Sequence, residues 1–561
     1  MVYLRINKKG GKYYFALYES HRLKRGREKG KVVTRQVRRI GATEDLLQLI
    51  LGAEEPMEEV PPQITSIREF GALIGLFQLM QEIGLEEVLR KYISGKSRKK
   101  ARLLTLIVLN KAVNAKTKRQ LALWYPKTVL PELLELPANE VYAESLCAAL
   151  DVLPTKSINL VLSDLLNRAD QLYGVDTNRL LLDASTIVFE GNRCVLVQFG
   201  YNAKYKRRRQ ILVFLVVTED KNFPIHLKVY PGNTHVASKT VELATAVRKK
   251  FSEQAVLFVT DNGFFTGANL SRLSRANIGL LTRLEKSNLV ARAAIKAVGE
   301  SFEEFGDPKD RTISQVLSIK AVGEYLSAKA PRKEEILSQF RKTRLVVIKT
   351  PQGEKAAQEF QARIEKMQRV LERIQAQCAQ QRRKKYDPTI AKVYEVTRGL
   401  RSLVQFELQQ VEETGQLSLE FALRQERIDG RKQRMGRFVL ITNREDLTNK
   451  EMFDIYLSKF AIEEAYRTLK TEMDIETPYH RLVNRVKVDL LMSVIAYFFW
   501  RMLHIRLRAK GEQRSVKEIL EVLSDLKEVQ LNETVRCYNE ADKALTILNI
   551  LNVSLPSELV F

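Results

Sequence analysis

Four residues near the end of the sequence have types and spacing suited to chemistry on a polyanion. Tyr456, Lys459, Glu463 and Lys470 lie in DIYLSKFAIEEAYRTLKTEMDIETPYHR, which predicts one continuous helix. At about 100° per residue, their side chains fall within roughly 60° of arc. The apolar residues gather on the opposite side: Ala461, Ile462, Ala465 and Leu469. One face can therefore be buried while the other presents a metal-binding carboxylate between phosphate-binding groups. Taken alone, such a helix would equally suit a solvated charged face.

Two upstream segments each end a strand-like apolar run in an aspartate. Asp183 follows three leucines in RLLLDASTIVFEG, and Asp261 follows the apolar run of AVLFVTDNGFF. Continuous apolar runs predict strands covered on both faces, and a carboxylate at such a strand is costly unless it is paired or metal-bound. Either aspartate alone would also suit a turn at a strand end. With Glu463 they make three hard oxygen ligands, the requirement for holding a pair of Mg²⁺ ions.

The order of these residues resembles the acidic triad of DDE transposases from bacterial insertion sequences. The triad comprises Asp183, Asp261 and, after a long gap, Glu463. The helical segment is similar to the Y-x2-R-x3-E-x6-K (Y-R-E-K) signature of the IS four / IS sixteen-thirty-four type, with Lys459 where arginine is usual. The resemblance extends to YPGNTHVASKTVEL and to RLVNRVKVDLLMSVIAYFFWRML, so it covers most of the chain.

This resemblance implies a ribonuclease-H-like catalytic core and metal-dependent phosphoryl transfer on DNA. Asp183, Asp261 and Glu463 would be the catalytic residues and would hold two Mg²⁺ ions, with Mn²⁺ as a possible substitute. The enzyme would nick the element end, in some members through a hairpin, and join the 3′ end to target DNA in a cut-and-paste reaction. Tyr456 would support or stack on DNA. Lys459 and Lys470 would clamp phosphates, although lysine offers a point charge where arginine offers a planar fork.

The predicted fold class is a multidomain α+β protein. A ribonuclease-H-like catalytic core is interrupted by a large insertion domain and is preceded by a small basic β-sheet and a helical domain. The predicted segments are a basic β-rich N-terminal domain (1–50), a helical DNA-binding domain (64–170), the first part of the core (175–285), the insertion domain with a long helical arm (286–437), the second part of the core with the Y-R-E-K helix (438–510) and a C-terminal helical region (511–561). From the pattern alone, the core would be a mixed sheet with helices.

Glu463 lies 202 residues after Asp261, far more than one crossover needs, so an insertion is expected between them. From Glu354 to Lys385 the sequence is almost free of Gly and Pro and is dense in charged and amide residues, which predicts a long exposed helix or an antiparallel coiled arm. A return strand is expected at GRFVLITN. Thr448 and the glutamate three residues later then form a capping box for the next helix. Both tryptophans lie outside the insertion, so an inserted tryptophan wedge is not expected.

The charge balance favours a polyanionic partner. Lys and Arg number 92 against 67 Asp and Glu, a net charge of +25, although ribosomal or membrane-surface partners would explain this sign equally well. Residues 1–41 carry 13 of these cations and two Glu in alternating strand-like runs, which indicates a small sheet that contacts DNA, a partner subunit or only solvent. The clusters KYKRRRQ, expected as a loop over the metal site, and GRKQRMGR are candidate phosphate contacts. Besides the signature residues, the expected DNA contacts are Lys204, Lys206, Arg207, Arg208, Arg209 and Arg467.

The remaining features indicate a cytoplasmic, nucleoid-associated protein of a bacterium or archaeon. The four cysteines are scattered singly, which suggests a reducing compartment and no zinc site. No signal peptide is expected, and the apolar run from Leu490 to Trp500 is too short to span a bilayer. The expected partners are element terminal inverted repeats, target DNA and a second copy of the chain, with no membrane and no small-molecule substrate. The alternatives are a metal-dependent nuclease that cuts without joining and an inactive DNA-binding regulator descended from a transposase.

Overall fold

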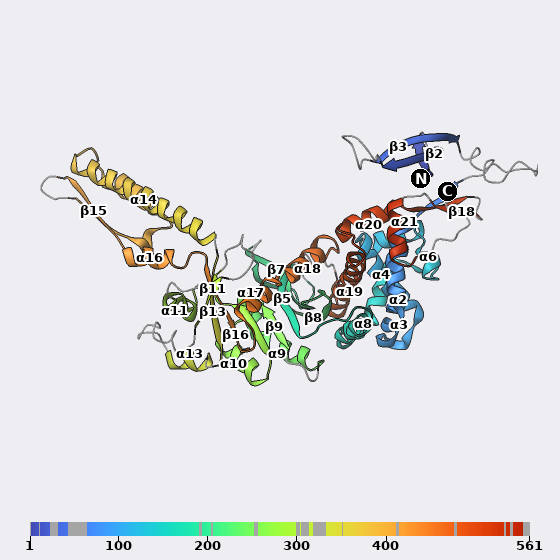
Figure 1. Ribbon diagram of the computed structural model, residues 1–561, viewed down its shortest axis with the longest axis horizontal. Coiled ribbons are helices and arrows are strands. Elements are labelled where there is room, and N and C mark those ends of the chain that lie inside the picture. The colour runs from blue at the N-terminus through green and yellow to red at the C-terminus, as the bar shows by residue number, and fades with distance from the viewer. Residues whose placement is uncertain are drawn as a thin grey trace, which may run out of the picture. The chain divides into compact units, whose positions relative to one another are not determined.

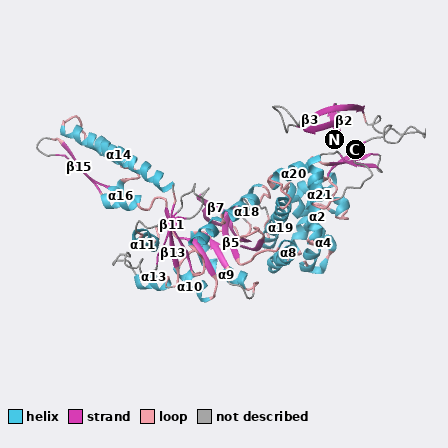
Figure 2. Ribbon diagram, in the orientation of Figure 1, coloured by secondary structure: helices cyan, strands magenta, loops and turns pink. Residues whose placement is uncertain are grey.

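The computed structural model divides the chain into two compact units (Figures 1 and 2). The first unit comprises Met1–Thr177, Leu181–Thr234 and Phe460–Phe561, and the second comprises Asn178–Leu180 and His235–Lys459. The predicted six-segment division remains a prediction. The structure describes residues 2–9, 12–22, 32–42, 64–189, 193–202, 206–251, 256–285, 287–298, 303–304, 313–317, 333–340, 342–350, 352–410, 415–475, 480–531, 535–538 and 542–553.

The N-terminal residues of the first unit form the predicted small sheet. Strands β1 (Val2–Lys9), β2 (Lys12–Arg22) and β3 (Val32–Gly41) pair antiparallel in the order β1-β2-β3. Phe15 and Ala16 on β2 are buried. A second sheet joins distant parts of the chain, because β4 (Ile64–Glu69) pairs with β17 (Lys527–Leu531), which in turn pairs with β18 (Val535–Tyr538).

Helices make up most of the rest of the first unit. They are α2 (Gly71–Glu82), α3 (Leu85–Tyr92), α4 (Arg98–Val113), α5 (Lys118–Trp124), α6 (Leu130–Leu133), α7 (Ala143–Asp151), α8 (Ile158–Tyr173), α18 (Phe460–Thr471), α19 (Val483–Arg508), α20 (Val516–Ser524) and α21 (Asp542–Ile550). Helix α19 is apolar on nearly all sides, so it forms the centre of the unit and packs against α2, α4, α7 and α8.

By length and composition alone, α19 could cross a membrane, and α7 passes the same test together with the bent segment that follows it. However, 83% of the most apolar window of α19 is buried inside the protein, as in the core helix of many proteins without a membrane span. The apolar run from Leu490 to Trp500 therefore lies in a buried helix, as its composition predicts.

Four strands follow along the chain, and the first of them is the strand predicted at RLLLDASTIVFEG. They are β5 (Arg179–Val188), β7 (Lys206–Thr218) and β8 (Pro224–Pro231), with β6 (Gln198–Asn202) added beside β7. Gly232, in the YPGNTH segment, lies so close to the backbone of β7 that a Cβ at this position would collide with the Gln210 carbonyl group. Strand β5 begins in the second unit and continues in the first.

The second unit contains a mixed sheet covered by helices. Its strands run in the order β11 (Glu303–Glu304), β12 (Ile313–Leu317), β13 (Arg344–Lys349), β16 (Arg437–Thr442), β10 (Gly279–Arg283) and β9 (Leu257–Thr260). Strands β9 and β10 are parallel, and the other pairs are antiparallel. The helices are α9 (Val236–Arg248), α10 (Gly267–Arg275), α11 (Leu289–Ala297), α13 (Lys333–Gln339) and α17 (Asn449–Leu457). The strand predicted at GRFVLITN is β16, so this prediction is confirmed.

The predicted long helix is α14 (Gln352–Ala379), and it has a hydrophobic core of its own. Buried residues recur along one face at alternating spacings of four and three: Phe360, Ile364, Met367, Leu371, Ile374 and Cys378. This face packs against α15 (Tyr386–Val396) and the hairpin of β14 (Val404–Gln410) and β15 (Leu417–Leu423), with α16 (Gln425–Lys432) following. The predicted long helix is therefore present, but one of its faces is covered by its own chain and only the other is exposed.

Candidate active site

The signature segment forms two helices where one was predicted. Tyr456 lies on α17 and Glu463 on α18. Helix α17 ends because the Ser458 hydroxyl donates to the Ile455 carbonyl at 2.7 Å, and the Lys459 amide closes a tighter turn onto the residue three positions earlier. The prediction of one helix with four aligned side chains is therefore wrong. The predicted capping box at the start of α17 is confirmed, since the Thr448 side chain accepts from the Glu451 amide.

In the first unit, two hydrogen bonds join α18 to strand β5. The buried Tyr466 hydroxyl lies 2.8 Å from the Val213 carbonyl oxygen and 3.1 Å from that of Asp183, so its single proton serves these two acceptors. One turn further along, Lys470 Nζ donates to the Thr186 carbonyl oxygen at 3.4 Å. Helix α18 and strand β5 therefore run in the same direction, and Asp183 lies beside Tyr466.

Glu463 is exposed and lies one turn before Tyr466. Around the helix axis it is separated from Lys470 by roughly 20°, so its side chain starts from the face that meets β5. Asp183 is half-buried on that strand. Ile462, Ala465 and Leu469 of the predicted apolar face are buried, whereas Ala461 is partly exposed. Burial also raises the pKa of Tyr466, which stays protonated as a hydrogen-bond donor.

In the second unit, Asp261 follows β9 and forms an ion pair with Lys459. Its carboxylate accepts from the Asn262 amide at 2.8 Å, and Lys459 Nζ lies 3.4 Å from Asp261 Oδ1. The side chain of Asp261 is 49% exposed, whereas that of Lys459 is only 13% exposed. Lys459 was expected to bind phosphate, but here its ammonium group balances the charge of the proposed metal-binding carboxylate.

Tyr456 completes this cluster. Lys459 Nζ lies 5.9 Å from the centroid of its ring, and the ring packs against Phe438, with 6.3 Å between centroids. Arg283 covers the Phe438 ring at 4.8 Å. Burial raises the pKa of Tyr456 above its ordinary value, so its hydroxyl stays protonated at neutral pH. The Tyr456 ring therefore lies beside Lys459, the cation that pairs with Asp261.

The other expected DNA contacts have mixed outcomes. Arg467 is exposed on α18. Arg208 and Arg209 lie on strand β7 instead of in a loop, so the expectation of a loop from 204 to 210 was wrong for residues 206–210. The side chains of Lys206 and Arg207 and the whole of Lys204 fall outside the described residues. Strand pairing places Arg209 opposite Phe199, with its guanidinium 5.2 Å from the ring centroid.

The cluster GRKQRMGR brings guanidinium groups together. Burial and the neighbouring Arg292 and Arg431 lower the pKa of Arg434. Such like-charged groups repel one another, which favours binding of an anion between them.

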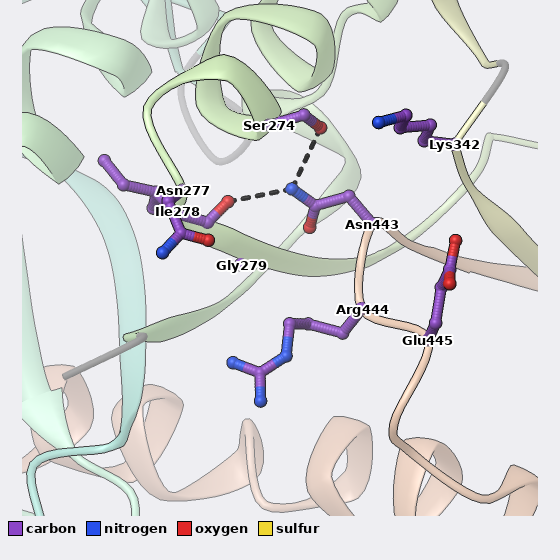
Figure 3. Close-up of a pocket in the computed structure, with 8 residues that line it drawn as sticks. All are labelled: Ser274, Asn277, Ile278, Gly279, Lys342, Asn443, Arg444 and Glu445. Carbon is purple, nitrogen blue, oxygen red and sulfur yellow. Dashed lines mark hydrogen bonds between the residues drawn. The ribbon is translucent and has the colours of Figure 1, made fainter.

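A small cavity of about 160 Å³ lies at the opposite end of the strands from Asp261 (Figure 3). It adjoins Gly279 at the start of β10, whereas Asp261 follows the end of the parallel strand β9. Its central polar group, the Asn443 amide, donates to Ser274 Oγ at 3.0 Å and to the Ile278 carbonyl at 2.8 Å. These hydrogen bonds brace the β10–β16 end of the sheet, so we assign this cavity a structural role.

Within the described ranges, no three His, Cys, Asp or Glu side chains stand close enough together to hold a metal ion. The structure thus brings α18 against the strand of Asp183, and it pairs Asp261 with Lys459. Tyr466 was missed from the sequence. Its position four residues after Ile462 and three before Leu469 marks it as part of the apolar stripe, which could have revealed it.

Comparisons with known proteins identify the family. The sequence pattern of the Transposase DDE domain family matches residues 175–499, which is more than half of the chain. No curated protein matches the sequence. Among solved structures, a piggyBac transposase synaptic complex with hairpin DNA is similar at a TM-score of 0.40 and 10% identity, covering 83% of this chain and 81% of that chain. A Mos1 transposase paired-end complex is similar at a TM-score of 0.15 and 14% identity, covering 44% and 78%.

These TM-scores are too low to bear on the fold or the function. The family match, by contrast, extends over β5, β9 and α18 and contains Asp183, Asp261 and Glu463 in order. The chain therefore belongs to the Transposase DDE domain family, and it is a DNA phosphoryl-transfer enzyme of the transposase class.

Proposed function

We propose that this chain is the transposase of an insertion sequence of the Y-R-E-K type, the IS four / IS sixteen-thirty-four group. It would cleave the element ends and join their 3′ ends to target DNA by cut-and-paste, on a ribonuclease-H-like core. The observation that carries the proposal is the family match over residues 175–499, a range that contains the residues of the proposed acidic triad and of the proposed signature. The contact of Tyr466 with the carbonyl of Asp183 supports it, because that contact couples the helix of Glu463 to the strand of Asp183.

The donor set fits hard divalent cations. All three candidate ligands are carboxylates, and the side chains of Asp261 and Glu463 are open to solvent. Asp183, Asp261 and Glu463 would hold two Mg²⁺ or Mn²⁺ ions, which when bound lower the cost of forming the attacking oxygen nucleophile and stabilise the leaving 3′-oxygen. Lys459 balances the charge of Asp261 at 3.4 Å, and it would turn towards a DNA phosphate once other cations share that carboxylate.

The cationic and aromatic groups around Asp261 suit a DNA strand. Tyr456 would support the strand near the cleavage point. Lys470 on α18, which already donates to the Thr186 carbonyl of β5, would hold a phosphate further along. Phosphate contacts of this kind fix the register of the DNA. Arg208, Arg209 and the cluster around Arg434 are further candidates, because each presents positive charge on an ordered element.

The proposed enzyme works as a homodimer on DNA. Cut-and-paste chemistry must bring two element ends together, and two-fold pairing is the commonest way for a protein to do so. The 28 residues of α14 extend about 42 Å, long enough to reach a second protomer or its DNA. Mass photometry of the complex with an element end should give two protomers and two ends, and a single protomer on one end in a complex competent for strand transfer would contradict this assembly.

A strand-transfer assay with a labelled element end, target DNA and Mg²⁺ tests the catalytic proposal. Asp183→Asn, Asp261→Asn and Glu463→Gln should each reduce cleavage at least about a thousandfold, while affinity for the end stays within about twofold. The matched control is Asp454→Asn, an exposed carboxylate on α17, which should cleave normally. Near-normal Glu463→Gln together with an inactive Glu464→Gln would show that the wrong glutamate was chosen.

The same assay separates the two alternative functions. A nuclease without joining activity would release cleaved ends but no product linked to target DNA. An inactive regulator would bind the end and leave it intact. Joined product from the wild-type protein is expected, because the triad and the spacing of the signature are intact.

A further inference from the structure

A cavity of about 480 Å³ in the first unit takes no part in the proposed reaction. It lies among α18, α19, the start of α20 and the turn between β7 and β8, and Figure 1 shows α18, α19 and α20 side by side. Most of the residues that line it are polar or charged, so the cavity offers polar contacts to a hydrophilic ligand.

Helix α18 presents a second polar face to this cavity. Glu464, Arg467, Thr468, Thr471 and Glu472 all line it and recur at positions i, i+3, i+4, i+7 and i+8. Around the axis, this stripe extends from about 40° to about 180° from Glu463. One helix therefore carries the proposed catalytic glutamate on one face and the wall of the cavity on the next.

Positive charge exceeds negative charge in the lining. Four permanent cations, Arg467, Arg501, Arg508 and Lys517, face two carboxylates. One of these carboxylates, Glu472, already pairs with Lys517 at 3.4 Å. The excess of cations would be relieved by a bound anion.

Two of these cations have donors to spare. Among the described residues, the Arg467 guanidinium has no hydrogen-bond or ion-pair partner. Arg501 uses its Nε to donate to the Lys221 carbonyl at 3.0 Å, which leaves its terminal amino groups available. A guanidinium fork matches the oxygen atoms of a phosphate group in geometry as well as in charge.

Neutral groups complete the lining. The buried side-chain oxygen of Asn222 lacks a hydrogen-bond partner within the described part of the chain, so it could accept from a ligand hydroxyl. Burial raises the pKa of Tyr497 to about 12, which keeps its hydroxyl a donor. Ser515 caps α20, and the first turn of that helix borders the cavity. Helix N-termini favour anions.

We propose that this cavity binds a phosphate group, with Arg467 and Arg501 as its principal ligands. The phosphate would come either from the backbone of bound DNA or from a free nucleotide. A phosphate held there would restrain the helix that carries Glu463. Only the choice of DNA as the source rests on the proposed function, since the binding chemistry stands without it.

His504 offers a built-in reporter. Burial, together with Arg501 and Arg508, lowers its pKa to about 4. The facing groups on the other elements are Glu464 and Arg467 on α18, Glu472 directly after that helix, and Lys517 on α20. An anion bound between the arginines should weaken their effect on His504, so its pKa should rise towards the ordinary value.

The experiment follows the five histidine ring signals of ¹³C-histidine-labelled full-length protein by NMR. Inorganic phosphate is the first probe, and sodium chloride at equal ionic strength is the reference. The His504 signal is identified by its loss in His504→Gln. Phosphate should raise the pKa of His504 by about one unit or more. Arg467→Gln, which changes an exposed side chain, should weaken this response about tenfold in phosphate concentration, whereas the exposed Lys156→Gln should leave it unchanged.

Two further probes identify the source without metal or turnover. If the source is DNA, an element-end duplex should shift His504, and Arg467→Gln should lower the salt slope of duplex binding by about one. If the source is a free nucleotide, adenosine 5′-monophosphate should shift His504 and the salt slope should stay unchanged. The proposal is overturned if neither phosphate, nucleotide nor duplex moves His504 beyond the chloride reference. Loss of catalysis in the triad assay would leave all these readings unaffected.

Discussion

Replacing Asp489 with asparagine should destabilise the first unit by about 3–5 kcal/mol. This buried carboxylate on α19 lies 2.5 Å from Lys118 Nζ and 3.6 Å from Lys111 Nζ. His480 Nε2 lies 3.8 Å away. The side chains of Asp489, Lys118 and Lys111 are only 13%, 14% and 8% exposed. Asparagine preserves the volume but leaves two buried ammonium groups without their ion-pair partner.

The magnitude follows from these distances and from burial. At an effective dielectric constant of about 20, a pair at 3.6 Å attracts by roughly 4–5 kcal/mol, part of which offsets the cost of burial. Burial alone would raise the pKa of Asp489, yet Lys111 and Lys118 hold it well below its usual range. Burial lowers the pKa of Lys111 even beside this carboxylate, so Lys111 depends on Asp489 for its charge.

Urea unfolding followed by tryptophan fluorescence measures this effect selectively, because both tryptophans belong to the first unit. Trp500 lies on α19 itself and donates to the Ala112 carbonyl at 2.8 Å. The matched control is Asp151→Asn, which breaks the pair of Asp151 with Arg485 at the start of the same helix. That pair is 35% and 29% exposed, so its loss should cost about 1 kcal/mol or less.

The reasoning would be refuted if Asp489→Asn unfolded with the same free energy as Asp151→Asn. A second variant keeps the test sharp. Adding Lys111→Met to Asp489→Asn removes one of the two uncompensated charges while keeping an extended side chain, so it should recover part of the lost stability. Further destabilisation by Lys111→Met would show that packing, and not charge, dominates at this site.

Three other outcomes are expected. Tyr466→Phe removes the hydroxyl that donates to the buried Val213 carbonyl, so the free energy of unfolding in urea should fall by about 1–3 kcal/mol. The same substitution should reduce cleavage more than it reduces binding of the element end. Its control, the exposed Tyr142→Phe, should be neutral. The free energy of unfolding should fall as the pH is lowered from about 6.5 to about 4. In this window His504 takes up a proton in the unfolded chain, whereas in the folded protein the pKa of His504 is about 4. An equally steep pH profile in His504→Gln would contradict this origin. Deleting residues 1–41 should weaken end binding and flatten its salt dependence by removing 13 cations, and an unchanged slope would reassign this sheet to dimerisation or solubility.

The sequence by itself determined the local elements. Apolar runs and alternation predicted β5, β9 and the N-terminal sheet, because strand periodicity reflects which faces are covered. The uniformly apolar run in α19 predicted a buried helix, and Thr448 with Glu451 predicted a helix start. The acidic triad was also proposed from residue types and order, and its roles remain predictions.

Only the tertiary structure decided how these elements meet. The signature segment forms two helices, with the hydrogen bond from Ser458 to the Ile455 carbonyl at the end of the first. The ion pair of Lys459 with Asp261 joins residues nearly 200 positions apart. The hairpin that covers α14 and the charged cavity beside α18 likewise depend on side chains from several elements. Sequence periodicity reports which face of an element is buried, but not which partner buries it, because the partner is chosen by packing across the whole chain.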